Sequence, residues 1–96
     1  QMTFPKIPMK ISSFIVNKHF KKQFSKLNRK IQDAFEDRAR VFIKDETHPS
    51  LNNHPLHREW DQCWSINITG DVRAIYRLEK NIAVFMAIGT HSELYE

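Results

Sequence analysis

The hydrophobic positions of this 96-residue chain change their period along the sequence. Residues 10–16 are rich in β-branched and aromatic side chains and predict a first strand. After Asn17, which can cap a helix, apolar residues recur every three or four positions to about Lys44, with a break near Asn28. Residues 45–55 contain two prolines and three Asn or Asp residues, which predicts a loop. We therefore expect one strand, two helices and a loop.

The last third of the chain has the two-residue period of β-strands. Apolar and polar residues alternate over 64–69 and again over 72–78, and Gly70-Asp71 between them predicts a hairpin turn. After a second turn, residues 82–88 are almost wholly apolar, as in a central strand. The predicted fold class is α+β: an N-terminal strand and two helices packed on one face of an antiparallel sheet that ends in a three-strand meander, with the other face partly open.

The length limits the organisation of the chain, because 96 residues suffice for one hydrophobic core but not for two. We expect residues 9–96 to form a single domain, and we interpret residues 1–8 as a tail or edge segment, either natural or left from expression. The lone Cys63 cannot form an internal disulfide. No apolar run reaches membrane-spanning length, and no secretory leader is evident. These features predict a cytoplasmic protein without a membrane partner.

The charge is distributed unevenly along the chain. Residues 1–32 carry eight basic residues and no acidic one, whereas residues 33–96 carry seven basic and eleven acidic residues. This asymmetry is equally typical of a surface that faces a polyanion and of a solvated, lysine-rich helix face. The polar side of the two predicted helices is expected to expose six cations to solvent: Lys18, Lys21, Lys22, Lys26, Arg29 and Lys30.

Polar and charged residues gather on the open face of the predicted meander. Strand alternation and the hairpin bring together Ser65, Asn67, Thr69, Asp71, Arg73 and Arg77. His54 and His91, in the segments that flank the meander, are the two imidazoles best placed to reach this surface. A metal-free ribonuclease needs a base, an acid and a cation beside the phosphate, and histidine, aspartate and arginine suit these tasks. An aromatic residue such as Tyr95 can stack on a base.

Each of these residues also has a purely structural explanation. Arg73 and Arg77 suit an exposed strand, and Asp71 suits a turn. His57 is interpreted as a surface residue. The spacing of His54 and His57 could suggest metal ligands, but Pro55 disfavours a helix there and no thiolate or carboxylate pattern completes a site. We therefore expect no metal and no other cofactor.

Three stretches of the chain resemble the RelE/ParE superfamily of toxins and, within it, the YafQ-like toxins: residues 53–56, 64–76 and 88–95. With the lysine-rich helical segment and the order of elements, the resemblance covers residues 9–96. It implies a RelE-like fold and a toxin of a type II toxin–antitoxin system. It further implies a ribosome-dependent endoribonuclease that cleaves translated mRNA. The implied partners are a cognate antitoxin, mRNA and the ribosome, with operator DNA reached only through the antitoxin complex.

The resemblance also assigns roles to individual residues. The cleavage site of YafQ-like toxins is built from histidines and an aspartate, which correspond here to His54, Asp71 and His91. Arg73 matches the position of a phosphate-binding arginine in RelE-like members. His91 is the expected general acid, and the base is either His54 or Asp71.

A second set of residues is expected to bind RNA without exchanging protons: Arg77, Asn67, Tyr95, Lys18 and Lys22. Asn67 stands where YafQ-like toxins usually have a histidine, and Ala87 stands where they often have an arginine. An asparagine can hydrogen-bond a phosphate but cannot transfer protons.

Two other functions remain open at this point. ParE-like members of the superfamily poison DNA gyrase, but they generally lack the histidine-bearing ending Gly89-Thr90-His91. A degenerate toxin that retains only antitoxin binding is the other alternative.

Overall fold

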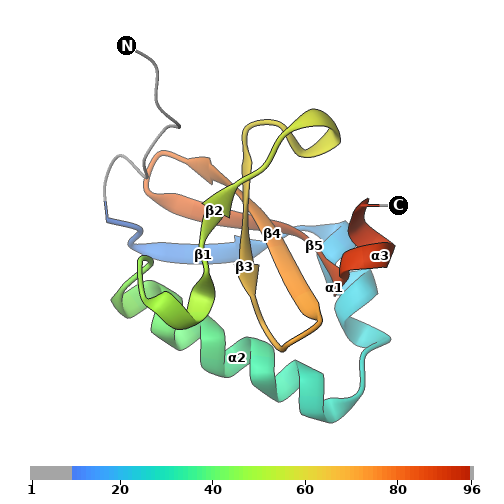
Figure 1. Ribbon diagram of the computed structural model, residues 1–96. Coiled ribbons are helices and arrows are strands. Elements are labelled where there is room, and N and C mark those ends of the chain that lie inside the picture. Colours follow the sequence, from blue (N-terminus) through green and yellow to red (C-terminus); the bar gives the residue numbers. More distant parts are fainter. Residues whose placement is uncertain (1–9, 96) are drawn as a thin grey trace.

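The computed structural model describes residues 10–95, so the interpretation of residues 1–8 as a tail lies outside the described part of the chain. Figure 1 shows the arrangement of the elements. In chain order they are β1 (Ser13–Val16), α1 (Lys18–Ser25), α2 (Arg29–Lys44), the 3₁₀ turn η1 (Pro49–Leu51), β2 (His54–Pro55), the 3₁₀ turn η2 (Arg58–Trp60), β3 (Cys63–Asn67), β4 (Val72–Glu79), β5 (Ile82–Thr90) and α3 (His91–Tyr95).

The strands form one five-stranded sheet in the order β1-β5-β4-β3-β2. Strands β3, β4 and β5 pair in antiparallel fashion, so the predicted meander and the α+β class are confirmed. Strand β1 lies beside β5 in parallel orientation, with Ser13 opposite Ile82, and the sheet is therefore mixed. The apolar run of β5 is explained by this position, because a strand with neighbours on both edges and residues packed on both faces has little contact with water.

Two asparagines begin the two helices where the sequence pattern breaks. The side chain of Asn17 accepts a hydrogen bond from the backbone N–H of Phe20 at 2.8 Å, and that of Asn28 accepts one from Ile31 at 3.0 Å. Each asparagine thus satisfies a backbone donor that has no partner within its helix. The six cations predicted for the polar face of these helices are all exposed.

The main core lies between the two helices and one face of the sheet (Figure 1). Phe85 of β5 is fully buried at its centre, and its ring centroid lies 5.4 to 5.9 Å from the centroids of five other aromatic rings. These neighbours are Phe14, Phe20, Phe35, Phe42 and Tyr76. Four phenylalanines from β1, α1 and α2 thus surround one residue of the central strand.

The second face of the sheet is covered in part, in agreement with the prediction that this face is partly open. Buried Cys63, Ile75 and Ala87 form a small apolar cluster on it, and residues from the η2 segment and α3 pack against this cluster. The indole Nε1 of Trp60 donates a hydrogen bond to the backbone oxygen of Leu94 at 3.0 Å, which joins η2 to α3. No helix in the described residues is long and apolar enough to cross a membrane.

The loop before β2 is anchored from inside the core. The buried hydroxyl of Tyr76 donates a hydrogen bond to the side-chain oxygen of Asn53 at 2.9 Å, and the amide nitrogen of Asn53 donates to the backbone oxygen of Glu46. Burial raises the pKa of Tyr76, which keeps its hydroxyl in the donating form. The prediction of a continuous loop was wrong at its end, because His54 and Pro55 pair with β3.

Candidate functional site

A cavity of about 460 Å³ opens on the second face of the sheet, beside η2 and α3. Its walls come from β2, β3, β4, α3 and the segment around η2, so residues far apart in the sequence meet there. The lining residues are Asn52, His54, Leu56, His57, Arg58, Glu59, Ser65, Arg73, His91 and Tyr95. Among the described lining residues, two arginines and three histidines face a single carboxylate, so the cavity suits an anionic ligand.

His54 is held by a contact that fixes its protonation pattern. Its Nδ1 lies 2.7 Å from the backbone oxygen of Asn52. A carbonyl oxygen can only accept a hydrogen bond, so Nδ1 carries the proton and donates it. The neutral ring then has its lone pair on Nε2. His54 is exposed on the edge strand β2, directly opposite Ser65 of β3.

Arg73 is half-buried at the end of the β3–β4 hairpin. Its Nη1 donates to three backbone oxygens, those of Thr69, Gly70 and Val72, at 3.1 to 3.3 Å. These contacts hold one edge of the guanidinium group against the hairpin. The Nε and Nη2 donors have no hydrogen-bond partner in the described residues, which leaves them available to a phosphate oxygen.

His91 begins the short helix α3, and a capping box sets its position. The backbone N–H of Glu93 donates to the hydroxyl of Thr90 at 3.2 Å, and the N–H of Thr90 donates to the carboxylate of Glu93 at 2.7 Å. The ring of His91 contacts that of Tyr95 one turn later, with centroids 4.6 Å apart. The sequence analysis did not predict this helix, although Thr90 and Glu93 have the required spacing.

Gly89 leaves room for the capping box, which gives a first prediction. A Cβ at position 89 would lie 2.8 Å from Glu93 Oε1 and 3.3 Å from Glu93 Cβ. We expect Gly89→Ala to displace the Glu93 side chain, to lower stability by about 1 kcal/mol and to weaken His91 positioning. Thermal unfolding and amide exchange at Thr90 measure both effects. Gly70→Ala is the control, since no atom lies within 4 Å of the added Cβ. Equal unfolding temperatures for the two variants would contradict the prediction.

Two buried polar atoms beside the cavity have no hydrogen-bond partner among residues 10–95. They are the hydroxyl oxygen of Ser65, whose residue is fully buried and lines the cavity, and the side-chain oxygen of Asn67. Asn67 lies opposite Arg73 in the β3–β4 pair. An unsatisfied buried polar atom costs about 1–3 kcal/mol, and such atoms in a native fold often belong to a functional site.

Of the nine residues predicted for the site, four line the cavity: His54, Arg73, His91 and Tyr95. The other five do not line it: Asn67, Asp71, Arg77, Lys18 and Lys22. Asp71 is exposed in the hairpin turn, and its backbone N–H donates a hydrogen bond to the hydroxyl oxygen of Thr69. Arg77 lies opposite Cys63, further along β4, and forms an ion pair with Glu79. The lysines are exposed on α1.

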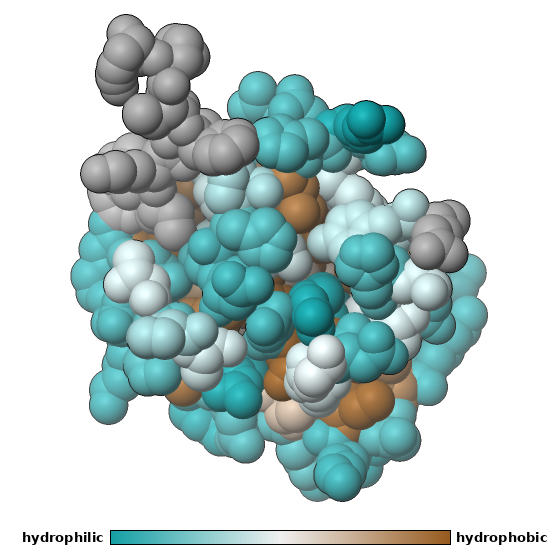
Figure 2. Space-filling view, in the orientation of Figure 1, coloured by the Kyte–Doolittle hydropathy of each residue, from teal (hydrophilic) through white to brown (hydrophobic). Residues whose placement is uncertain are grey.

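The segment around η2 supplies cavity residues that the sequence analysis missed. They are Asn52, Leu56, His57, Arg58 and Glu59, and His57 had been interpreted as a surface residue. This segment has neither a two-residue nor a 3.6-residue period, so no pattern indicated which side chains turn toward the sheet. The projecting turn that carries η2 (yellow in Figure 1) is strongly hydrophilic in the space-filling view of Figure 2.

Metal ligation and thiol chemistry have little support in the described residues. Residues 10–95 contain no group of three or more His, Cys, Asp or Glu side chains arranged to hold a metal ion. Burial raises the pKa of Cys63, which keeps its sulfur in the unreactive thiol form. The histidines are therefore the cavity groups suited to proton transfer near neutral pH.

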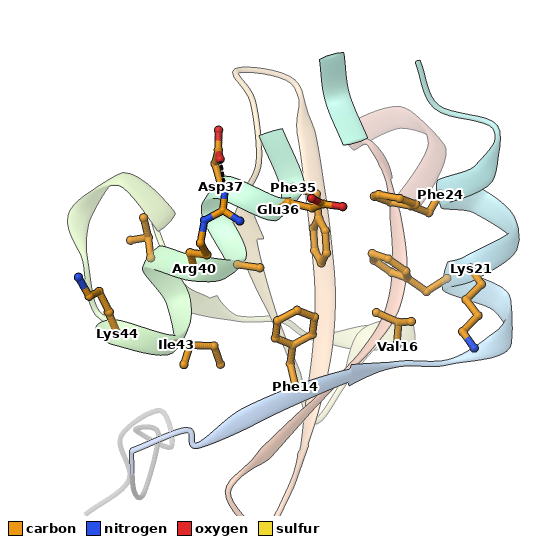
Figure 3. A pocket seen from close by; sticks show the side chains of 13 residues that line it. Phe14, Val16, Lys21, Phe24, Phe35, Glu36, Asp37, Arg40, Ile43 and Lys44 are labelled. Carbon is orange, nitrogen blue, oxygen red and sulfur yellow. Dashed lines mark hydrogen bonds and ion pairs between the residues drawn. The ribbon is translucent and has the colours of Figure 1, made fainter. Parts of the chain in front are cut away.

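A second, larger hollow of about 910 Å³ lies on the opposite side of the sheet, between β1 and the two long helices. We call it the helix groove. Figure 3 shows apolar side chains converging in it from β1, α1 and α2, with Lys21 and Lys44 at opposite ends. Its apolar lining includes Phe14, Val16, Phe20, Phe24, Phe35, Ala39, Val41 and Ile43. An apolar hollow of this size is typical of a protein-binding surface.

Several solved structures share this fold. Crystal structures of E. coli YafQ (TM-score 0.74, 17% identity) and of the E. coli DinJ-YafQ toxin-antitoxin complex (TM-score 0.71, 17% identity) are similar to this structure; each match covers 86% of this chain, and 97% and 96% of the other chain. The toxin-antitoxin complex RelBE2 from Mycobacterium tuberculosis matches with a TM-score of 0.69 and 18% identity, over 83% of this chain and 98% of the other. These likenesses show the fold.

The family is shown by the sequence itself. No curated protein matches the chain. A family model described as a bacterial toxin of a type II toxin-antitoxin system, YafQ, matches residues 12–96, which is most of the chain. The chain therefore belongs to the YafQ family of toxins of bacterial type II toxin–antitoxin systems.

Proposed function

We propose that this toxin is a metal-independent endoribonuclease that cleaves mRNA on the translating ribosome. The observation that carries the proposal is the cavity in which His54, Arg73, His91 and Tyr95 meet. In the reaction, the 2′-hydroxyl of a nucleotide attacks the adjacent phosphorus and loses its proton to a base. The 5′-oxygen of the next nucleotide leaves and receives a proton from an acid. The products carry a 2′,3′-cyclic phosphate and a 5′-hydroxyl.

His54 is the proposed base. The contact of its Nδ1 with the backbone oxygen of Asn52 leaves Nε2 of the neutral ring as the proton acceptor. The same contact stabilises the imidazolium that forms when Nε2 takes the proton, since Nδ1 continues to donate. Asp71, the alternative base, is exposed in the hairpin turn and does not line the cavity. This geometry favours His54 over Asp71.

His91 is the proposed acid and Arg73 the proposed phosphate ligand. The capping box and the contact with Tyr95 hold the His91 ring at the cavity wall. The free edge of the Arg73 guanidinium can form two parallel hydrogen bonds with the phosphate as negative charge accumulates on it. One donor of this kind contributes about 100- to 1,000-fold to a rate. The half-buried ring of Tyr95 is placed to stack on a base.

The remaining predicted RNA ligands are proposed to act outside the cavity. Lys18 and Lys22 are exposed on α1 and attract the RNA backbone at longer range. Asn67 pairs with Arg73 across the strands, and its unpartnered oxygen can accept a hydrogen bond from a 2′-hydroxyl if the strand end opens slightly. Arg77 forms an ion pair with Glu79. It can therefore bind RNA only when a phosphate replaces the Glu79 carboxylate.

Mapping of mRNA 5′ ends after brief induction of the toxin tests the proposal. New ends within translated codons, absent when translation initiation is blocked, are the expected result. Growth arrest without new ends would instead favour the poisoning of DNA gyrase. Soluble expression with neither effect would favour a degenerate toxin that only binds its antitoxin.

We further propose that the helix groove receives a segment of the cognate antitoxin. The groove is apolar along its floor, and its rim carries Lys21, Arg40 and Lys44 against Glu36 and Asp37. Arg40 is already paired with Asp37 at 2.7 Å, whereas Lys21 and Lys44 form no ion pair in the described residues. An amphipathic segment with apolar residues on one side and acidic residues at its margins fits this pattern.

Two neighbouring residues of β1 allow a matched test of this docking site. Val16 lines the groove, whereas Ile15 points away from it and is 54% exposed. We expect Val16→Asp to weaken antitoxin binding at least tenfold, because a carboxylate would be buried without a partner. Ile15→Asp adds the same charge to the same strand and should leave the affinity within about twofold, as expected for an exposed position. Titration calorimetry measures both, and equal affinities would remove the groove as the docking site.

A further inference from the structure

We propose that Arg58 binds a second RNA phosphate in the cavity, beside the phosphate held by Arg73. The inference rests on the proposed ribonuclease function and names a substrate-binding residue that the resemblance to known toxins did not assign. It makes the substrate class more specific, because two arginines that hold two phosphates select a polynucleotide over a mononucleotide.

Arg58 has a free guanidinium group at the cavity. It lines the same cavity as Arg73, but it comes from η2 instead of the sheet. The residue is exposed, and its side chain forms no hydrogen bond or ion pair in the described residues. The planar group of an arginine can hold a phosphate through two parallel hydrogen bonds. The side chain is therefore available to a ligand, and no packing role accounts for it.

The backbone at Arg58 is in a conformation that disfavours any residue with a Cβ. Its φ is +60°, in the left-handed region that glycine adopts most readily. Residues held in this region against their preference occur in turns and cluster at functional sites, where the surrounding structure compensates for the strain. Gln62, in the same segment, has a φ of +71° but does not line the cavity. The two positions thus share a backbone strain and differ in their access to the ligand.

The turn that carries Arg58 is anchored to α3. The hydrogen bond from Trp60 to the backbone oxygen of Leu94 ties η2 to α3, and Leu56 and Trp60 pack on the same apolar cluster as Leu94 and Tyr95. Because α3 also carries His91, these contacts link Arg58 to the element that holds the proposed acid. A phosphate held by Arg58 would therefore orient the neighbouring nucleotide with respect to the scissile bond.

Replacing Arg58 and Gln62 in turn with glycine distinguishes an effect on RNA binding from an effect on backbone strain. The probe is a fluorescent RNA hexanucleotide with 2′-O-methyl groups, which the proposed reaction cannot cleave. We expect Arg58→Gly and Gln62→Gly each to raise Tm by a few degrees, because glycine relieves the left-handed backbone. Arg58→Gly should weaken RNA binding about tenfold and flatten the slope of log K against log salt by about 0.7, the value for one lost phosphate contact with a single strand. Gln62→Gly should leave both unchanged.

Three outcomes would overturn the proposal, and a fourth would separate it from the ribonuclease function. Equal RNA affinity for wild type, Arg58→Gly and Gln62→Gly overturns it, and so does the absence of any RNA binding by the wild type. A loss of affinity together with a fall in Tm in Arg58→Gly also overturns it, because Arg58 would then support the fold. If binding depends on Arg58 while the wild type cleaves no mRNA, the second phosphate site stands and the ribonuclease function fails.

Discussion

Replacing His91 with alanine is expected to lower the rate of mRNA cleavage about 100- to 10,000-fold, the usual contribution of a general acid. His91 is exposed, lines the cavity and contacts only the ring of Tyr95 among the described aromatic residues. Its removal takes away the proposed proton donor for the departing 5′-oxygen and leaves the core untouched. The rate should be measured on ribosomes programmed with a defined mRNA, together with the melting temperature of each variant.

His19→Ala is the matched control for this experiment. His19 is also exposed, but it lies on α1 and does not line the cavity. We expect it to cleave at the wild-type rate. A wild-type rate in His91→Ala, with cleavage still occurring in translated codons, would remove His91 from the reaction. An equal loss of cleavage rate in His91→Ala and His19→Ala would indicate that these histidines act through the overall charge of the protein and not through proton transfer in the cavity.

Phe85→Ala is expected to destabilise the fold by about 3–5 kcal/mol, the range for removing a buried phenylalanine side chain. The ring is fully buried and contacts five aromatic rings that come from β1, α1, α2 and β4. The cavity left by the deletion would therefore border four other elements of the main core. Since a small domain has a total stability of about 5–15 kcal/mol, a large part of the variant would be unfolded at 37 °C.

Urea unfolding followed by circular dichroism measures this loss. Phe24→Ala is the control, because Phe24 is only half-buried and contacts two aromatic rings, Phe20 and Phe35. We expect it to cost clearly less than Phe85→Ala. Similar urea midpoints for Phe85→Ala and Phe24→Ala would mean that Phe85 of β5 contributes no more to the stability of the core than Phe24 does.

The regular elements of the fold were predictable because each has a local signal. Asn17 and Asn28 cap the two helices, and the alternation around Gly70 specifies the hairpin. The parallel pairing of β1 with β5 has no such signal, because strand orientation depends on the path of the chain between the strands. The capping box of α3 was readable from Thr90 and Glu93, but five residues provide no helical period.

The candidate site was predictable where it lies on regular strands and at their ends. Alternation places Arg73 correctly, and the family resemblance indicated His54 and His91, which line the cavity with it. Arg77 shares the alternation of Arg73 but lies further along β4, where Glu79 binds it. Arg58 was missed, since a left-handed residue in a 3₁₀ turn follows no periodic rule. The sequence pattern thus predicts on which face of the sheet a side chain lies, but not how far along the strand it lies from the cavity.

The position of β5 has a consequence for the synthesis of the toxin. β5 lies between β1 and β4, contacts α1 and leads directly into α3, yet it is made after β1, α1, α2 and β4. A nascent chain that has been translated only as far as β4 contains β1 and both long helices but lacks the strand on which they pack. Contacts between segments so distant in sequence cannot form until the later segment has left the ribosome. The main core of this domain therefore cannot close around the helices until β5 has emerged from the ribosome.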